Sequence, residues 1–348
     1  MSIRTRIRND KPCLARSACK NSVAPTPVMH RFIIVIACSL SAGALLAAED
    51  SLVQEREWGK NRGIVKVSKS VYRWGSDNQY GAYIVGSDAI AVVDGHYCDS
   101  GTMPWLKEEI AKRHDVPVRY VILSHDHPDH ICNSQVFDDT AITIGHKNIL
   151  PHILREKRLS SVPDITFEES MDVMLGDVTV NLFFLGPSHS DNLIQIHIAD
   201  EKVLIAVDMA KGRSLFPDYR DMDVHSTLNI LKVLGNIEDV DIVLPGHGPV
   251  TDQQNFREQR RYLQALRDVV LGYMVEGRSL TEIRDRVTLD EFSDYGAYDR
   301  WLDQNIVTMW GYLYRYREPS QRITEDEAVL CREDMNQCRT SDPVESSM

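Results

Sequence analysis

One short stretch of the chain concentrates side chains that bind metal ions, His125-Asp126-His127-Pro128-Asp129-His130. Imidazole and carboxylate groups are the ligands for zinc and related borderline metals. In an extended segment His125 and His127 project to the same side and can bind one ion together. Asp129 and His130 follow one turn later and can face a second ion. A motif of this kind arises by chance on the order of once per thousand such chains, so it predicts a metal site.

Three further candidate ligands follow at intervals along the chain. His189 lies in Gly-Pro-Ser-His-Ser-Asp-Asn, Asp208 ends an apolar run, and His247 lies in Pro-Gly-His-Gly-Pro after another apolar run. Each lies at the end of a predicted strand, where loops gather above a sheet and sites are usually built. Together the candidates number five His and two Asp, enough for two ions with three protein ligands each and one bridging group.

The elements that must position these ligands alternate between strands and helices. Apolar patterning and turn residues predict strands at 64–67, 71–74, 82–85, 89–94, 118–123, 141–144, 178–185, 193–198, 202–207 and 242–244. The same reasoning predicts helices at 103–114, 225–235, 252–273, 279–287 and 298–316. Two mixed halves of this kind predict an α/β fold in which two sheets stack face to face, with helices outside.

Charge and the N-terminal segment bear on partners and location. Met29, a candidate start, and Arg31 precede an apolar run at 32–48 that ends in small residues, so 1–48 is typical of a signal peptide or targeting segment. That segment holds seven Lys or Arg and one acid, so the remaining 300 residues carry a formal charge of −18 rather than the −12 of the whole chain. A protein this acidic repels the phosphate backbone, so we do not expect nucleic acid as a partner. We expect a periplasmic or secreted protein with a small-molecule substrate and no stable membrane association after signal cleavage; a single N-terminal anchor is the alternative.

These motifs, in this order, resemble the metallo-β-lactamase superfamily over roughly 65–250. The resemblance implies an αββα sandwich with two metal ions at one edge. His125, His127 and His189 would hold the first ion. The ligands of the second ion would be Asp129, His130 and His247, with Asp208 as the bridge. Asp94 matches a family aspartate that is usually structural.

The resemblance divides the chain into four expected segments. These are a targeting segment at 1–48, a metallo-β-lactamase-like domain at 49–250, a helical C-terminal appendage at 251–317 and a polar tail at 318–348. The aromatic residues within 301–316 are expected to pack in a core or a dimer contact. In the second case the C-terminal helices would form the contact of a homo-oligomer.

The implied activity is hydrolysis by two zinc ions per chain, with iron or manganese as other candidate metals. Two ions lower the pKa of a bridging water, and Asp129 would orient the resulting metal-bound hydroxide as the catalytic residue. The superfamily hydrolyses lactams, thioesters, lactones and other esters, so the fold leaves the substrate open. Asp208, where many zinc β-lactamases have Cys, is typical of glyoxalase II-like enzymes. Lys211 or Arg213 could bind an anionic substrate, as a lysine three residues after that position does in several β-lactamases.

Two alternative functions are compatible with the same residues. One is a mononuclear iron enzyme of the persulfide dioxygenase type, which uses two His and one Asp of this ligand set. The other is a periplasmic metal-binding accessory protein with little turnover. Metal analysis would separate the first alternative from a dizinc hydrolase, and a substrate panel would separate the second.

Several other side chains carry weaker expectations. In an oxidising compartment Cys331 and Cys338 could form a local disulfide, whereas Cys98 and Cys132 are expected to be buried thiols. Most of the remaining histidines are expected on the surface or in packing roles; His96 is the one to watch, because it follows Asp94. Phe216 and Tyr219 are candidates for lining a substrate pocket.

Overall fold

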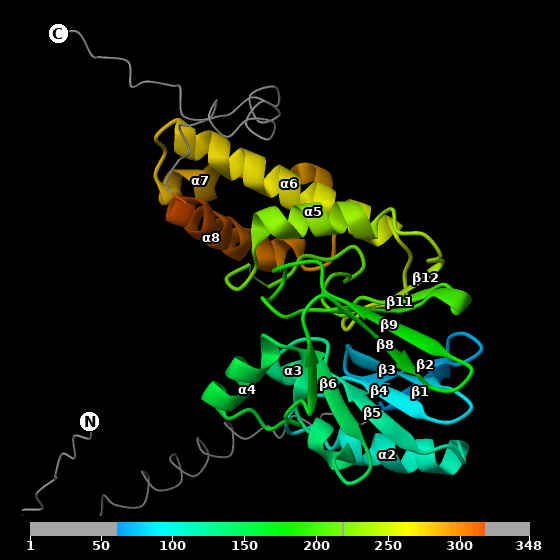
Figure 1. The fold of residues 1–348 in the computed structure, drawn as a ribbon. Coiled ribbons are helices and arrows are strands. Elements are labelled where there is room, and N and C mark those ends of the chain that lie inside the picture. The colour runs from blue at the N-terminus through cyan, green and yellow to red at the C-terminus, as the bar shows by residue number, and fades with distance from the viewer. Residues whose placement is uncertain (1–60, 218, 317–348) are drawn as a thin grey trace, which may run out of the picture. The chain divides into compact units, whose positions relative to one another are not determined.

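The computed structural model of the chain describes residues 61–217 and 219–316 (Figure 1). The predicted targeting segment at 1–48, the tail at 318–348 and the proposed Cys331–Cys338 pair therefore lie outside the described residues. None of the helices in the described part is both long and apolar enough to cross a bilayer.

Two sheets form the centre of the described part. The first has seven strands in chain order, antiparallel from β1 to β4 and parallel from β4 to β7. Its strands are β1 (Gly63–Lys66), β2 (Val71–Ser76), β3 (Gln79–Val85), β4 (Ile90–Val93), β5 (Val118–Ile122), β6 (Ile142–His146) and β7 (Ile165–Phe167). The second has the order β12-β11-β10-β9-β8. Its strands are β8 (Ser170–Met174), β9 (Thr179–Phe183), β10 (Gln195–Ile198), β11 (Val203–Ile205) and β12 (Ile242–Leu244).

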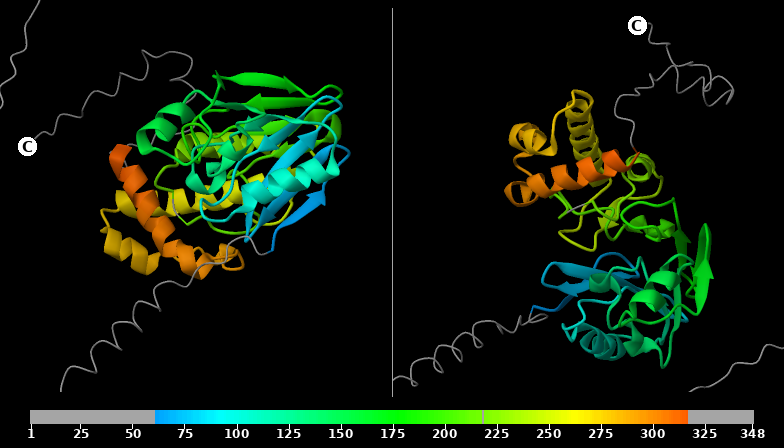
Figure 2. Two further views of the ribbon diagram at one scale, coloured as in Figure 1. Left: turned by 90° about the horizontal axis from the view of Figure 1, so that it is seen from below. Right: turned by 90° about the vertical axis from the view of Figure 1, so that its left-hand side faces the viewer.

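Helices cover the outer face of each sheet (Figures 1 and 2). The first sheet carries α2 (Thr102–Arg113), α3 (Pro128–Ile131), the short 3-10 helix η1 (Ser134–Phe137) and α4 (Ile149–Glu156). The second carries α5 (Val224–Leu234), α6 (Gln254–Val275), α7 (Leu280–Arg286), η3 (Asp290–Phe292) and α8 (Tyr298–Tyr316), and η2 (Ala199–Glu201) joins β10 to β11. The result is the expected αββα sandwich with helices at its C-terminal end.

The inner strands of each sheet, such as β4, β10 and β11, bury side chains on both faces, because successive residues of a strand point to opposite sides. On β5, Ile122 joins the core between the sheets, whereas its neighbour Val121 packs with α2. On β11, Val203 and Ile205 face the first sheet, and Leu204 joins the cluster formed with the outer helices. Strands buried on both faces read as continuous apolar runs, which is the pattern found here.

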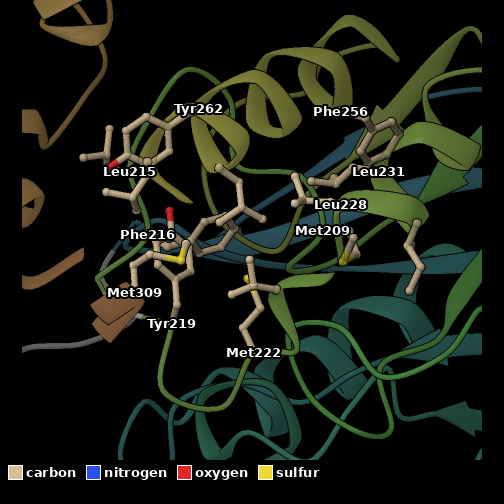
Figure 3. Packing of buried hydrophobic residues seen from close by; sticks show 14 of the residues in the cluster. Met209, Leu215, Phe216, Tyr219, Met222, Leu228, Leu231, Phe256, Tyr262 and Met309 are labelled. Atoms are coloured by element: carbon tan, nitrogen blue, oxygen red, sulfur yellow. The ribbon is translucent and has the colours of Figure 1, made fainter. Parts of the chain in front are cut away.

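The C-terminal helices share one hydrophobic cluster with α5 and with the loop after Asp208. Figure 3 shows Phe216 and Tyr219 of this loop beside Tyr262 of α6 and Met309 of α8. The Asn305 side chain links them further, because it accepts a hydrogen bond from the Tyr262 hydroxyl (2.8 Å) and donates to the Phe216 carbonyl (2.9 Å). The helices expected as an appendage therefore support a loop next to the candidate metal ligands.

Predicted and observed elements differ in three places. The sequence reasoning missed α4, β7 and β8. Each of the two strands has a single buried residue and so little apolar pattern, whereas α4 buries Ile149 and Ile153 on one face and was missed despite that pattern. The strands predicted at 193–198 and 202–207 are shorter, at Gln195–Ile198 and Val203–Ile205, and the 3-10 turn η2 joins them. The predicted helix at 279–287 begins after Ser279, whose hydroxyl accepts from the Glu282 amide in a capping box.

Candidate metal centre

The segment 125–130 passes from extended backbone into the short helix α3, and this change points its side chains to different sides. It follows β5, so His125 and His127 lie on extended backbone, and His127 is the N-cap of α3. Pro128 occupies the first turn, where its missing N–H costs nothing. Asp129 and His130 lie within this helix. One short sequence therefore offers ligands on two sides.

The first cluster brings together four of the candidate ligands, His125, His127, His189 and Asp208. Nε2 of His189 lies 3.1 Å from Nδ1 of His127 and 3.1 Å from Oδ2 of Asp208. Nε2 of His125 lies 3.8 Å from the same Oδ2. Ligands about 2.1 Å from a tetrahedral zinc lie about 3.4 Å from one another, so these separations fit one ion.

The second cluster contains Asp129, His130 and His247. Oδ2 of Asp129 lies 3.3 Å from Nε2 of His247 and 3.6 Å from Nε2 of His130. Oδ1 of Asp208 lies 3.4 Å from Nε2 of His130 and 3.8 Å from Nε2 of His247. Each oxygen of Asp208 thus faces a different cluster, which is the arrangement that a bridging ligand requires.

Buried polar atoms support a cation at this place. His125 Nε2 and Asp208 Oδ1 are buried, and among the described residues neither has a hydrogen-bond partner. A buried lone pair without a hydrogen-bond donor or a cation beside it lowers the stability of the fold. A metal ion bound by these atoms would supply that partner, so the donor set fits the metal that the motif predicts.

The electrostatics of the two clusters differ. Burial holds the pKa of His125 well below its ordinary value, with a smaller contribution from His127. Burial also lowers the pKa of His130, but the carboxylates of Asp208 and Asp129 outweigh burial and hold it well above the ordinary value. Burial alone would raise the pKa of Asp208, yet the surrounding imidazoles hold it well below the ordinary range. The second cluster therefore attracts positive charge.

Asp94 ties both clusters to the first sheet. Its buried carboxylate accepts hydrogen bonds from the Ser124 amide (2.7 Å) and hydroxyl (2.8 Å) and lies 3.5 Å from Nδ1 of His130. The same hydroxyl lies 2.9 Å from Nδ1 of His125. Partners of this kind orient imidazole ligands. His96 is buried as well, which lowers its pKa to about 4, but it joins neither cluster.

A cavity of about 320 Å³ opens onto the two clusters. Lys211 and Phe216 line it, and the Lys211 ammonium lies 4.9 Å from the centroid of the Phe216 ring. Arg213 is not among the lining residues; its guanidinium pairs with Asp294 at 2.5 Å. Tyr219 is fully buried in the neighbouring core rather than at this cavity. The other lining residues are Tyr97, His127, Asp129, His189, Asp208, Pro217, Arg220, Asp221 and His247.

The expectation of free thiols at Cys98 and Cys132 is wrong, because the two form a disulfide. The His96 amide donates to the Cys132 carbonyl (3.0 Å), which brings the loop after β4 against the end of α3. The bridge thus fixes the helix that carries Asp129 and His130. Sequence reasoning missed the pairing because the two cysteines are 34 positions apart, and only the fold brings them together.

A third group of acids and imidazole, Asp126, His152 and Asp191, is already satisfied by protein partners. The Asp126 carboxylate accepts from Arg158 (3.0 Å) and from Asn192 (2.8 Å). This group anchors the segment 125–130 from the outside rather than offering open ligands.

Gln79 is a site residue that the sequence did not reveal. Its side-chain nitrogen donates to the Asp129 carbonyl (2.7 Å) and lies 2.9 Å from Nδ1 of His130. A buried glutamine some 50 residues from its partner carries no local signal. Ser124, by contrast, adjoins the ligand motif and could have been found there.

The comparisons with known proteins agree with this geometry. The sequence model of the Metallo-beta-lactamase superfamily matches residues 77–247, which include all seven candidate ligands. A Bacillus cereus protein named metallo-beta-lactamase type 2 is 27% identical over 173 residues, which are 48% of this chain and 66% of that protein. The match thus spans just under two thirds of that relative's own length.

Solved structures share the fold. A metallo-beta-lactamase from Pontibacter korlensis is 18% identical with a TM-score of 0.54, over 59% of this chain and 99% of that one. A metallo beta lactamase from Hirschia baltica is 17% identical with a TM-score of 0.52, over 59% and 98%. With two stacked sheets and the candidate ligands at the strand ends, the match assigns residues 77–247 of this chain to the metallo-beta-lactamase superfamily.

Proposed function

We propose that the chain is a metal-dependent hydrolase with two zinc ions, which cleaves an amide, lactone, ester or thioester bond. The observation that carries the proposal is the position of Asp208, whose two oxygens face two separate clusters of imidazoles. Two bound cations would lower the pKa of a shared water molecule and polarise a substrate carbonyl. A complete second cluster favours two ions over the mononuclear iron alternative.

Asp129 is the residue we assign to proton transfer. Burial alone would raise its pKa, but His130 and His247 outweigh burial and hold it below the ordinary value, so it is ionised near neutral pH. Its side chain is 29% exposed and lines the cavity, so it can reach a substrate. As a carboxylate it can accept a proton from the attacking water and pass it to the leaving atom.

Lys211 is the residue we assign to substrate binding, in preference to Arg213. It lines the cavity and is half-buried, whereas Arg213 is paired with an acid outside it. An ammonium group in this position favours a substrate that carries a carboxylate, and β-lactams are among the candidates.

The disulfide between Cys98 and Cys132 supports export. Disulfides persist in oxidising compartments and are rare in the cytosol, so the bond agrees with the predicted signal segment. We therefore propose a periplasmic or secreted location. In the periplasm, glutathione thioesters would be scarce, which leaves cyclic amides and esters as the first substrates to test.

The test is metal analysis of purified protein followed by a panel of lactams, lactones and thioesters. We expect about two zinc ions per chain and hydrolysis of at least one class. His127→Ala should lower turnover by more than about 100-fold, because loss of even an outer partner of a ligand costs about 10–100-fold. His114→Ala is the matched control, because His114 belongs to none of the three groups and contacts Tyr83 of β3 instead.

Three outcomes would contradict the proposal. One iron per chain with oxygen consumption would indicate the dioxygenase alternative. Bound metal without turnover across the panel would indicate the accessory protein. Unchanged turnover in His127→Ala would exclude the assigned clusters.

A further inference from the structure

The β2–β3 hairpin holds the loop that carries His247, although the two segments are far apart in the sequence. The hairpin turn, Asp77-Asn78, has positive φ at both residues. The Asn78 carbonyl lies 2.9 Å from Nδ1 of His247, and its side-chain oxygen accepts from the Gly248 amide (2.9 Å). An Nδ1–H that donates to the Asn78 carbonyl leaves Nε2 of His247 free to act as a ligand.

Arg73, on β2, holds both sides of the same loop. Its guanidinium donates to the Pro245 carbonyl (3.0 Å) and to the Gly248 carbonyl (2.6 Å). The guanidinium carbon lies 3.7 Å from the centroid of the Tyr80 ring, which keeps the group in place. Burial lowers the pKa of Arg73 to about 10, so it remains a cation at neutral pH. Within the described residues, no carboxylate pairs with it.

We propose that Arg73 is a positioning residue for the second cation site, acting through the loop that carries His247. The inference rests on the proposed function, because it assumes that His247 binds a metal ion. The loop holds glycines on both sides of His247, and backbone of this kind loses much conformational entropy when it is ordered. By fixing the two carbonyls that flank His247, Arg73 orders the loop before a metal ion binds.

The direction in which zinc affinity changes when Arg73 is replaced distinguishes a positioning role from a purely electrostatic one. Arg73 is a cation, and removing a cation near a metal site would by charge alone strengthen metal binding. Loss of positioning would weaken it. A methionine at this position keeps an unbranched side chain that can pack on Tyr80 but has no donors for the two carbonyls.

The experiment compares zinc affinities of the full chain and of Arg73→Met by competition with a chelator. We expect one of the two zinc ions to lose about 10–100-fold in affinity, the range found for outer partners of metal ligands, while the other is unchanged. Arg73→Lys, which keeps the charge and can reach one carbonyl, should recover part of the loss. Arg257→Met is the matched control, because Arg257 also donates to a loop carbonyl, that of Gly235 at the end of α5.

Two further readouts keep the test decisive. Asn78→Gly suits the positive φ of the turn and removes only the acceptor for Gly248, so it should fold and lose a smaller factor. Amide hydrogen exchange of the metal-free chain reports the order of the loop, because the Gly248 amide donates to Asn78; its exchange should be slow in the wild type and faster in Arg73→Met.

Unchanged or tighter zinc binding in Arg73→Met, with unchanged hydrogen exchange at the Gly248 amide, would overturn the inference. Equal losses in Arg73→Met and Arg257→Met would do the same, since they would indicate a general loss of stability. A wild-type chain that binds only one ion would instead overturn the proposed function, and hydrogen exchange at the Gly248 amide would still report on Arg73.

Discussion

Gly246 offers a direct test of how tightly the second cluster is built. It precedes His247 and packs against the other ligands. A Cβ atom added there would lie 2.6 Å from Cε1 of His130, 2.6 Å from Cγ1 of Val207 and 3.1 Å from Oδ1 of Asp208. Gly246 is not among the glycines with positive φ, so alanine suits the backbone and the perturbation is steric alone.

The size of the effect follows from these distances. Carbon atoms in contact lie about 3.5–4.0 Å apart, so the new methyl group must push His130 or the His247 loop away by about 1 Å. Metal–ligand distances tolerate about 0.2 Å. We therefore expect Gly246→Ala to lose more than about 10-fold in affinity for one zinc ion, as with outer-partner mutations, together with most turnover. Overpacking should also lower the free energy of unfolding by about 1–3 kcal/mol.

The assay combines zinc competition with urea denaturation of the metal-free protein. Gly272→Ala is the control, because a Cβ added at this position of α6 meets nothing within 4 Å. That variant should gain about 0.5–1 kcal/mol in stability and bind zinc as the wild type does. Wild-type zinc affinity in Gly246→Ala would refute the reasoning, because the site would then have room that the structure does not give it.

Two further predictions concern the cavity and the disulfide. Lys211→Met should raise KM by about 10–100-fold for a carboxylate-bearing substrate, since a hydrogen bond to a charged group contributes about 1.5–3 kcal/mol. The KM for the neutral methyl ester of the same substrate should be unaffected. An equal rise in the KM of both substrates, measured by steady-state kinetics, would contradict the assignment of Lys211. Cys98→Ser should lower the free energy of unfolding by about 2–4 kcal/mol, because the bond to Cys132 closes a loop of 34 positions. Urea denaturation should show this difference only without reductant; a difference that persists after reduction would indicate a packing effect.

The candidate ligands could be picked out from the sequence because ligand chemistry is local. His125 and His127 share a strand end, and His247 lies between glycines and prolines that have few other uses. The strands beside them are buried on both faces, so their apolar runs were visible as well. The edge strand β8 was missed because four of its five residues are exposed or half-exposed, which leaves little apolar pattern.

The supporting contacts were not predictable, because each joins residues that only the fold brings together. Gln79 contacts His130, and Asn78 contacts His247 across 169 positions. The hydrogen bonds involved use ordinary polar residues, which occur throughout any surface. An orienting contact therefore gives no pattern in a single sequence, whereas a ligand does.

The functional proposal depends on the charges of the ligand side chains in the two clusters more than on the fold. Burial, helped by His189, lowers the pKa of His127 to about 4, so this imidazole keeps its lone pair at neutral pH. Burial acts on His130 in the same direction, yet Asp208 and Asp129 reverse the outcome and favour a proton there. A proton on His130 and a cation bound by these carboxylates would compete for the same place. The chain thus concentrates negative charge beside neutral imidazoles, and that combination selects a cation whatever substrate the cavity accepts.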